Sequence, residues 1–251
     1  MSTTKTVNVT TGKVLHYTIK KTGYKPVSGS KLITESTTIN VNMVSSTSSS
    51  YPYVFGDRIG GVASFYMYFD SVNPDTNAQQ KYAVFALDSA YRWHGAWVGG
   101  VSDWVTSSTD YNTILNSTQS ATYRCSKILE HVTPSSGSYQ PLYYAMNPGG
   151  QSLIINVDGQ NYQAVVPNYK ELLTMWQYRT QLDAIDPTLS DGTGTWSLTN
   201  WYGGDSFGVW TCMSYDSNSG WGITNSGGYS RPWYDNRFDL GSAPVFEIPV
   251  N

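Results

Sequence analysis

Residues 166–172 read Val166-Pro167-Asn168-Tyr169-Lys170-Glu171-Leu172, and this stretch contains the strongest helix-start signal in the chain. Asn168 is a preferred N-cap residue, and Glu171, three positions later, completes a capping box. The helix should end at Asp186-Pro187, because a proline pushes the residue before it out of the α region. Its apolar face is expected to consist of Tyr169, Leu172, Leu173 and Trp176, continued by Leu182 and Ile185.

Strands and a second helix are predicted on both sides of this stretch. Residues 64–69 and 81–87 are rich in aromatic and β-branched side chains, which is typical of strands. Residues 154–157 and 162–166 flank Asp158-Gly159, a strong hairpin signal. A helix is expected from about Ser117 to His131, because its apolar residues recur at three-four spacing: Ala121, Cys125, Ile128, Leu129 and Val132. No helical period continues after Thr195, so the fold class is predicted to be α+β.

The N-terminal segment has a different pattern, and we predict two domains. Alternating residues at 6–10, 15–19 and 37–43 indicate a small all-β unit, with Gly12, Gly23 and Gly29 at turns. A run of serine and threonine at residues 45–50 is typical of a flexible linker. We therefore expect an anchor or spacer domain over residues 1–46 and a larger head domain over residues 51–251.

The composition indicates a recognition surface of low charge. Charged residues make up 13% of the chain, about half the usual fraction, and the formal net charge is -3. Binding to nucleic acid or to an anionic membrane surface needs clustered Lys and Arg, which the sequence lacks. No apolar run is long enough to cross a bilayer, and Met1 is followed directly by strand-like sequence without a secretion signal. Tyr, Ser, Asn and Gly must cover much of the surface, as they do in binding loops.

Few residues indicate metal or catalytic chemistry. Cys125 lies on the apolar face of a predicted helix, so a buried free thiol is expected rather than a bridge to Cys212. His16, His94 and His131 lack the spacing of a zinc site, and the Asp-Gly pairs at 158–159 and 191–192 are better explained as turns. We expect no metal, cofactor or catalytic site. A pair of carboxylates typical of a glycosidase could still form from distant residues, so a polysaccharide depolymerase stays an alternative.

The segment from Trp196 to Phe238 is the candidate binding region, because it holds eleven aromatic residues and five charged ones. Rings can stack on sugars or fill pockets, while neighbouring amides and hydroxyls supply hydrogen bonds. The residues expected in the core are Trp196, Trp201, Phe207 and Phe238. The residues expected to bind a ligand, because they lie among Gly and Ser, are Tyr215, Asn218, Trp221, Tyr229, Trp233, Tyr234 and Asn236. A subunit interface would use the same residues, and both alternatives stay open.

Several segments of the predicted head resemble one family when they are taken in order. They are residues 82–92, residues 166–172, Arg179, residues 185–188, the Trp/Ser/Tyr/Asn-rich stretch 210–221 and the ending 243–250. Together they resemble phage-encoded proteins with a C-type-lectin-like domain, related to the variable proteins of diversity-generating retroelements. Residues 1–46 are similar to small β repeats of phage fibre and tail proteins.

The resemblance implies a compact head in which two helices pack on an antiparallel sheet, with a loop-rich C-terminal face. It also implies a virion protein of a head or tail fibre, commonly a homotrimer, that contacts a glycan or protein on the host surface. Residues 1–46 would then contact other virion proteins. The sequence lacks the Glu-Pro-Asn and Gln-Pro-Asp triplets of calcium-dependent lectins, and residues 233–236 lack the Trp-Asn-Asp order. The alternative is a purely structural decoration protein whose aromatic face joins subunits.

Overall fold

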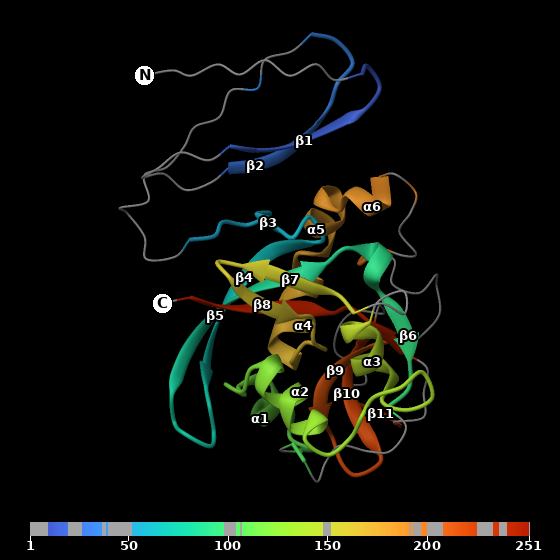
Figure 1. The fold of residues 1–251 in the computed structure, drawn as a ribbon. Coiled ribbons are helices and arrows are strands. Elements are labelled where there is room, and N and C mark those ends of the chain that lie inside the picture. The colour runs from blue at the N-terminus through green and yellow to red at the C-terminus, as the bar shows by residue number, and fades with distance from the viewer. Residues whose placement is uncertain are drawn as a thin grey trace.

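A computed structural model shows a mixed α+β architecture, as predicted (Figure 1). It describes residues 10–19, 27–36, 39, 52–97, 104–105, 107–147, 152–190, 192, 197–199, 208–224, 233–235 and 240–250. In chain order the elements are β1 (Val14–Ile19), β2 (Val27–Leu32), β3 (Arg58–Ile59), β4 (Ala63–Val72), β5 (Gln79–Leu87), the 3-10 helix η2 (Ser89–Tyr91), β6 (Trp93–Gly95), α1 (Tyr111–Leu115), α2 (Ala121–Leu129), α3 (Gln140–Met146), β7 (Ile154–Val157), β8 (Gln160–Gln163), α4 (Tyr169–Gln177), α5 (Arg179–Ile185), α6 (Pro187–Ser190), β9 (Gly208–Ser214), β10 (Ser219–Thr224), β11 (Trp233–Asp235), β12 (Leu240–Ser242) and β13 (Val245–Val250).

The antiparallel sheet β13-β5-β4-β3 separates two hydrophobic clusters. Phe85 of β5 pairs with Phe246 of β13 and with Phe65 of β4, and all three belong to the cluster that includes Ile155 of β7. Val84, the next residue along β5, belongs to the other cluster, which contains α2 and α4. Successive side chains of a strand point to opposite faces, so β5 contributes to both clusters. The predicted strands at 64–69 and 81–87 are confirmed.

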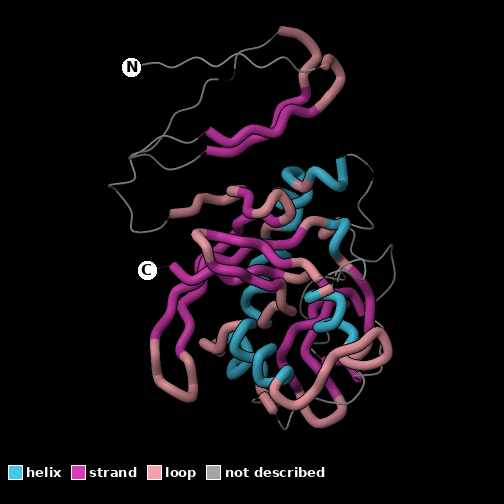
Figure 2. Tube along the Cα trace, viewed as in Figure 1, coloured by secondary structure: helices cyan, strands magenta, loops and turns pink. Residues whose placement is uncertain are grey.

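A second sheet, in the order β11-β10-β9-β12-β6, covers the other side of the helices. Every residue of its central strand β9 is buried. Helix α4 contacts β4 of the first sheet and β9 and β10 of the second, so it lies between the two sheets (Figures 1 and 2). The large cluster around α4 is therefore the main core of the described head.

The helix predicted from residue 169 is confirmed at its start and interrupted near its middle. Asn168 accepts a hydrogen bond from the Glu171 amide, and Glu171 accepts one from the Asn168 amide, which completes the capping box. Tyr178 leaves the helical conformation and separates α4 from α5. Asp186 is extended before Pro187, as the proline requires, and Pro187 then begins the short helix α6.

The other helix prediction placed the start four residues too early. Helix α2 begins at Ala121 because Ser120, not Ser117, is its N-cap. Cys125 and Ile128 are buried as predicted, whereas Leu129 is 37% exposed, which contradicts its place on the buried face.

The hairpin predicted at Asp158-Gly159 is confirmed, since both residues have the positive φ of a type I′ turn, 50° and 82°. Its second strand occupies Gln160–Gln163, earlier than the predicted 162–166. Val165 instead forms an isolated bridge with Val245 of β13.

At the N-terminal end, β1 and β2 form a separate antiparallel hairpin. The strand predicted at 15–19 and the turn at Gly12, whose φ is 84°, are confirmed. The turn predicted at Gly29 is wrong, because Gly29 lies inside β2 opposite Tyr17. The strands expected at 6–10 and 37–43, the turn at Gly23 and the linker at 45–50 lie almost entirely outside the described residues, and the two-domain division stays a prediction.

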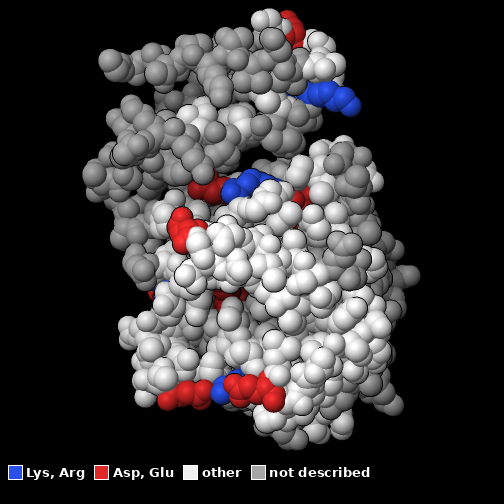
Figure 3. Space-filling model, in the orientation of Figure 1, with Lys and Arg blue, Asp and Glu red and all other residues white. Residues whose placement is uncertain are grey.

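Both cysteines are free and buried, as expected for Cys125. Within the described part of the chain, no helix is long and apolar enough to cross a membrane. The face in Figure 3 is largely uncharged, with acidic and basic side chains in a few small groups.

Candidate functional site

The β9–β10 hairpin carries three of the predicted ligand-binding residues, and one of them is in the core. Trp221 is 1% exposed, so its prediction as a surface residue is wrong. Its ring packs edge-on against Tyr169 of α4, with centroids 5.7 Å apart, and also contacts Tyr111. Its indole Nε1 donates to the Ser108 carbonyl oxygen at 2.8 Å. The flanking glycines suggested a loop, but they belong to a buried strand that packs on α4.

The other two, Tyr215 and Asn218, lie in the turn of the hairpin. Tyr215 is half-buried against Trp221, and Asn218 is exposed. The Tyr215 amide donates to the Ser219 carbonyl at 2.8 Å, and the Asn218 amide donates to Asp216 Oδ1 at 2.8 Å. The turn is thus held by its own bonds, while the Asn218 side chain is open to solvent. Ligand binding by these two residues stays a prediction.

The remaining candidates are placed only in part. Trp233 and Tyr234 belong to β11, where their backbones pair with Trp221 and Gly220 of β10. The candidates Tyr229 and Asn236 lie outside the described residues, as do the residues predicted for the core, Trp196, Trp201, Phe207 and Phe238.

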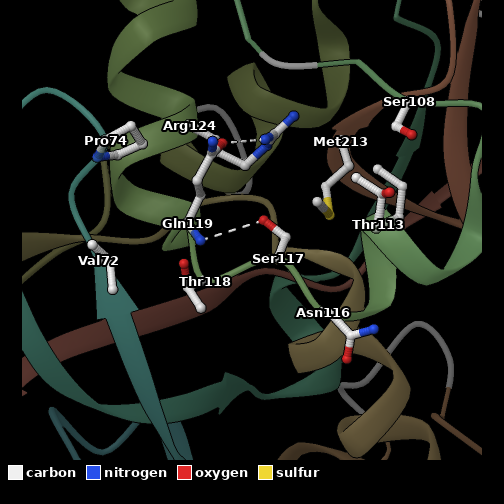
Figure 4. A pocket seen from close by; sticks show the side chains of 11 residues that line it. Val72, Pro74, Ser108, Thr113, Asn116, Ser117, Thr118, Gln119, Arg124 and Met213 are labelled. Carbon is white, nitrogen blue, oxygen red and sulfur yellow. Dashed lines mark hydrogen bonds between the residues drawn. The ribbon is translucent and has the colours of Figure 1, made fainter. Parts of the chain in front are cut away.

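A pocket of about 340 Å³ opens beside this hairpin (Figure 4). Its lining comes from the end of β4, the segment 108–119, the first turn of α2 and β9. Exposed Thr113, Asn116 and Thr118 line its outer part, and buried Ile114, Arg124 and Met213 line its inner part. Val72, Pro74, Ser108, Ser117 and Gln119 complete the described lining. Only Met213 comes from the C-terminal region that the sequence indicated.

The inner wall of the pocket is held by a chain of hydrogen bonds. Arg124 Nε donates to the Cys212 carbonyl oxygen at 3.1 Å, and one terminal nitrogen donates to Gln119 Oε1. The backbone amide of Gln119 donates to Ser117 Oγ at 3.3 Å, and the backbone carbonyl of Gln119 accepts from Asn168 Nδ2 at 3.3 Å. Burial lowers the pKa of the Arg124 guanidinium, and the group stays charged because arginine does not lose its proton in proteins. The wall is therefore tied to β9 and to the start of α4.

Ser108 joins the pocket to the hairpin. Its side chain lines the pocket, its amide donates to the Ser214 carbonyl at 3.2 Å, and its carbonyl accepts from Trp221. The pocket and the turn at Tyr215–Asn218 are thus linked through Ser108, and we refer to the two together as the pocket–turn face.

The chemistry of the pocket–turn face is that of a hydrogen-bonding ligand site. Hydroxyl and amide side chains both donate and accept hydrogen bonds, and Ile114 and Met213 add apolar surface. Such a mixture of apolar contact and a few polar groups is typical of small-molecule sites.

Two of the segments that carry the family resemblance, 82–92 and 185–188, meet in space away from the pocket–turn face. Arg92 is buried, and its guanidinium donates to the Leu87 carbonyl at 2.9 and 3.1 Å and lies 3.5 Å from Asp186 Oδ2. Asp186 Oδ2 also accepts from the Ser89 amide at 2.7 Å, and Asp183 lies 3.8 Å from Arg92. These residues join segment 82–92 to segment 185–188 and stabilise the fold.

A buried pair of carboxyl groups was not found by sequence reasoning. Glu247 of β13 accepts hydrogen bonds from the first two amides of α2, Ala121 at 3.0 Å and Thr122 at 2.6 Å. Glu171 is fully buried beside it, and burial, followed by the charge and hydrogen bond of Glu247, raises the pKa of Glu171 well above its ordinary value. Glu171 Oε1 is buried and has no hydrogen-bond partner among the described residues. The capping box indicated Glu171, but no local pattern indicates its distant partner.

The described residues contain no group of three or more His, Cys, Asp or Glu side chains that could hold a metal ion. Comparison of the chain with known protein families, with curated proteins and with solved structures finds no match.

Proposed function

We propose that this chain is a bacteriophage virion protein, a head or tail fibre or adhesin, that binds a host-surface ligand through the pocket–turn face. The observation that carries the proposal is the polar pocket that Ser108 links to the hairpin with the exposed turn. Both parts offer hydroxyl and amide groups to a ligand.

The proposed head is a C-type-lectin-like domain. Two features support this assignment: β13, late in the sequence, pairs with β5 in the first sheet, and helices α2 and α4 pack beneath it. The second sheet, β9 to β11, supports the proposed binding face. The motif segments 82–92 and 185–188 join around Arg92, so part of the resemblance rests on residues that stabilise the fold.

The proposed assembly follows from the family resemblance. Residues 1–46 would attach the chain to other virion proteins, and the head would be displayed on the particle as a homotrimer. Single contacts to a surface glycan or protein would be weak, and many copies on one particle would raise the overall affinity by avidity.

The proposal is tested by binding the purified full-length chain to a panel of bacterial strains with defined surface polysaccharides, measured by flow cytometry. We expect strong binding to some strains, and at least about tenfold weaker binding for the double variant Tyr215→Ala/Asn218→Ala, since central contacts each contribute 1 kcal/mol or more. Tyr178→Ala is the control, because it removes a tyrosine ring that is 40% exposed and lies between α4 and α5, outside the pocket–turn face. Trp221 is unsuitable, because its removal would disrupt the core.

Three results would contradict the proposal. Binding to no strain would exclude the adhesin role. A double variant that loses its oligomeric state in light scattering would support the structural alternative, in which this face joins subunits. New reducing ends in polysaccharide incubated with the protein would support the depolymerase alternative.

A further inference from the structure

The pocket of the pocket–turn face has a size and lining that indicate a class of ligand. Its volume of about 340 Å³ lies near the lower limit of ligand sites, which range from about 300 to 1,000 Å³. The pocket therefore suits a single ring better than a chain of several. This inference rests on the proposed function, since it concerns the ligand of the same face.

The polar groups of the outer pocket are neutral and have mixed hydrogen-bonding character. Thr118 and Asn116 are exposed, and Ser117 is half-buried between them. A serine or threonine hydroxyl donates one hydrogen bond and accepts others, and an amide does both with separate atoms. Sugar hydroxyls have the same double character, so this lining is complementary to an uncharged polyhydroxyl ring.

Arg124, the charged residue among the described lining residues, forms hydrogen bonds with the wall of the pocket. Arg124 donates to Gln119 (Figure 4) and to the Cys212 carbonyl, and both acceptors are neutral parts of the protein. The guanidinium thereby fixes the wall between α2 and β9. The groups nearest the opening, Thr113, Asn116 and Thr118, are uncharged.

The inner part of the pocket is apolar on one side. Met213 and Ile114 are buried there, and Figure 4 shows Met213 across the pocket from Gln119 and Thr118. A methionine thioether is polarisable and adapts its shape to a small apolar group. A ligand that fits both sides therefore has hydroxyl groups on one edge and a methyl group on the other.

We infer that the pocket binds one uncharged pyranose that carries a methyl group, with the methyl against Met213 and Ile114 and the hydroxyls against Ser117 and Thr118. Two kinds of surface sugar have this chemistry. A 6-deoxyhexose carries the methyl on C5, and an N-acetylhexosamine carries it in an acetamido group.

The test is saturation-transfer NMR on the full-length chain with four free sugars: rhamnose, N-acetylglucosamine, glucose and glucuronic acid. We expect transfer to rhamnose or to N-acetylglucosamine, strongest at the C6 or acetyl methyl protons, and at least about fivefold less to the other two sugars. The sugar that gives the signal shows whether the methyl group belongs to a 6-deoxyhexose or to an N-acetylhexosamine.

Variants of the pocket provide the second part of the test. Thr118→Val keeps the side-chain shape and removes an exposed hydroxyl, and adding Ser117→Ala removes a second one. Each neutral hydrogen bond contributes a factor of about five, so the single variant should bind about fivefold and the double variant about 25-fold more weakly. Thr180→Val, on the exposed surface of α5, is the matched control and should leave binding unchanged. Thermal melting of each variant shows whether the fold is intact.

Equal transfer to glucose, preferred binding of glucuronic acid, or undiminished binding by a folded Thr118→Val variant would overturn the inference. If such a protein still binds bacterial cells, only the inference fails and the proposed function stands. If the chain binds neither the sugars nor any strain, both fail.

Discussion

Replacing Glu171 by glutamine should make the protein less sensitive to high pH. In the structure, Glu171 is a fully buried carboxyl group beside Glu247, whose two oxygens accept the first amides of α2. Burial and the neighbouring Glu247 raise the pKa of Glu171 well above 4.5, so we expect Glu171 to keep its proton in the folded chain and to share it with Glu247. In Glu171→Gln, the side-chain Nε2 donates one of its own hydrogens to Glu247, so this contact no longer depends on a titratable proton. The side-chain Oε1 accepts from the backbone amide of Asn168.

The size of the effect follows from proton linkage. The unfolded chain releases this proton near pH 4.5, whereas the folded chain keeps it to higher pH. The free energy of unfolding therefore falls as pH rises above about 4.5, by at most about 1.4 kcal/mol per pH unit, until the raised pKa is passed. Because the glutamine of Glu171→Gln does not titrate, the variant does not show this fall in unfolding free energy. We expect the variant to be within about 1 kcal/mol of the parent at pH 5, and to gain on it steadily toward pH 8.

The assay is urea unfolding of both proteins at intervals from pH 5 to pH 8. Asp88, whose pKa burial raises to about 6, also titrates in this range, but it is present in both proteins and cancels in the difference. Glu130→Gln is the control, because Glu130 is an exposed residue paired with Lys127 and should give a pH-independent difference below about 0.5 kcal/mol.

The variant Glu247→Gln tests the assignment of the proton to Glu171. In Glu247→Gln, a side-chain amide faces the backbone amides of α2, whose hydrogen bonds the carboxylate accepts in the parent protein. The variant should lose about 2–5 kcal/mol of unfolding free energy at every pH. A difference between Glu171→Gln and the parent that does not change with pH would refute the shared proton. A tolerated Glu247→Gln with a damaging Glu171→Gln would also refute the assignment of the proton to Glu171.

Three further predictions concern the scaffold. Gly95→Ala should lower the free energy of unfolding by about 1–3 kcal/mol in urea titration, because the new Cβ would lie 2.4 Å from a side-chain carbon of α3. Asp186→Ala should cost about 3–5 kcal/mol in the same measurement, since it removes a carboxylate beside the buried guanidinium of Arg92. Cys125 and Cys212 should react with a thiol reagent only after denaturant is added, because both are buried; rapid labelling of the native protein would contradict this.

Local signals in the sequence were sufficient for the elements that are stabilised by their own residues. The capping box at Asn168 and Glu171 and the Asp158-Gly159 turn satisfy backbone groups within a few residues, so the short pattern contains the full explanation. Helix α3 was missed for the opposite reason. It follows Tyr139, whose φ is 52°, and it is held by Gln140, which bonds both the amide and the carbonyl of Ala96.

The candidate site was predicted less well, because burial and pockets depend on distant residues. Trp221 lies between glycines, and nothing near it in the sequence indicates that Tyr169 and Tyr111 cover its ring. The pocket joins Val72, Thr118 and Met213, which come from separate elements. Serine and threonine are common in every loop of this chain, so their presence alone does not indicate a lining.

The turn between β9 and β10 separates positions that can change from positions that cannot. Its backbone is closed by Asp216 and by Ser219, so exchanging the side chain of Ser217 or Asn218 leaves every bond of the sheet intact. By contrast, Ser108 has two roles: its carbonyl accepts a hydrogen bond from the buried Trp221 indole, and its side chain lines the pocket. Exchanges at the tip are therefore expected to leave the stability of the hairpin unchanged, whereas exchanges at Ser108 would disturb both the core and the pocket.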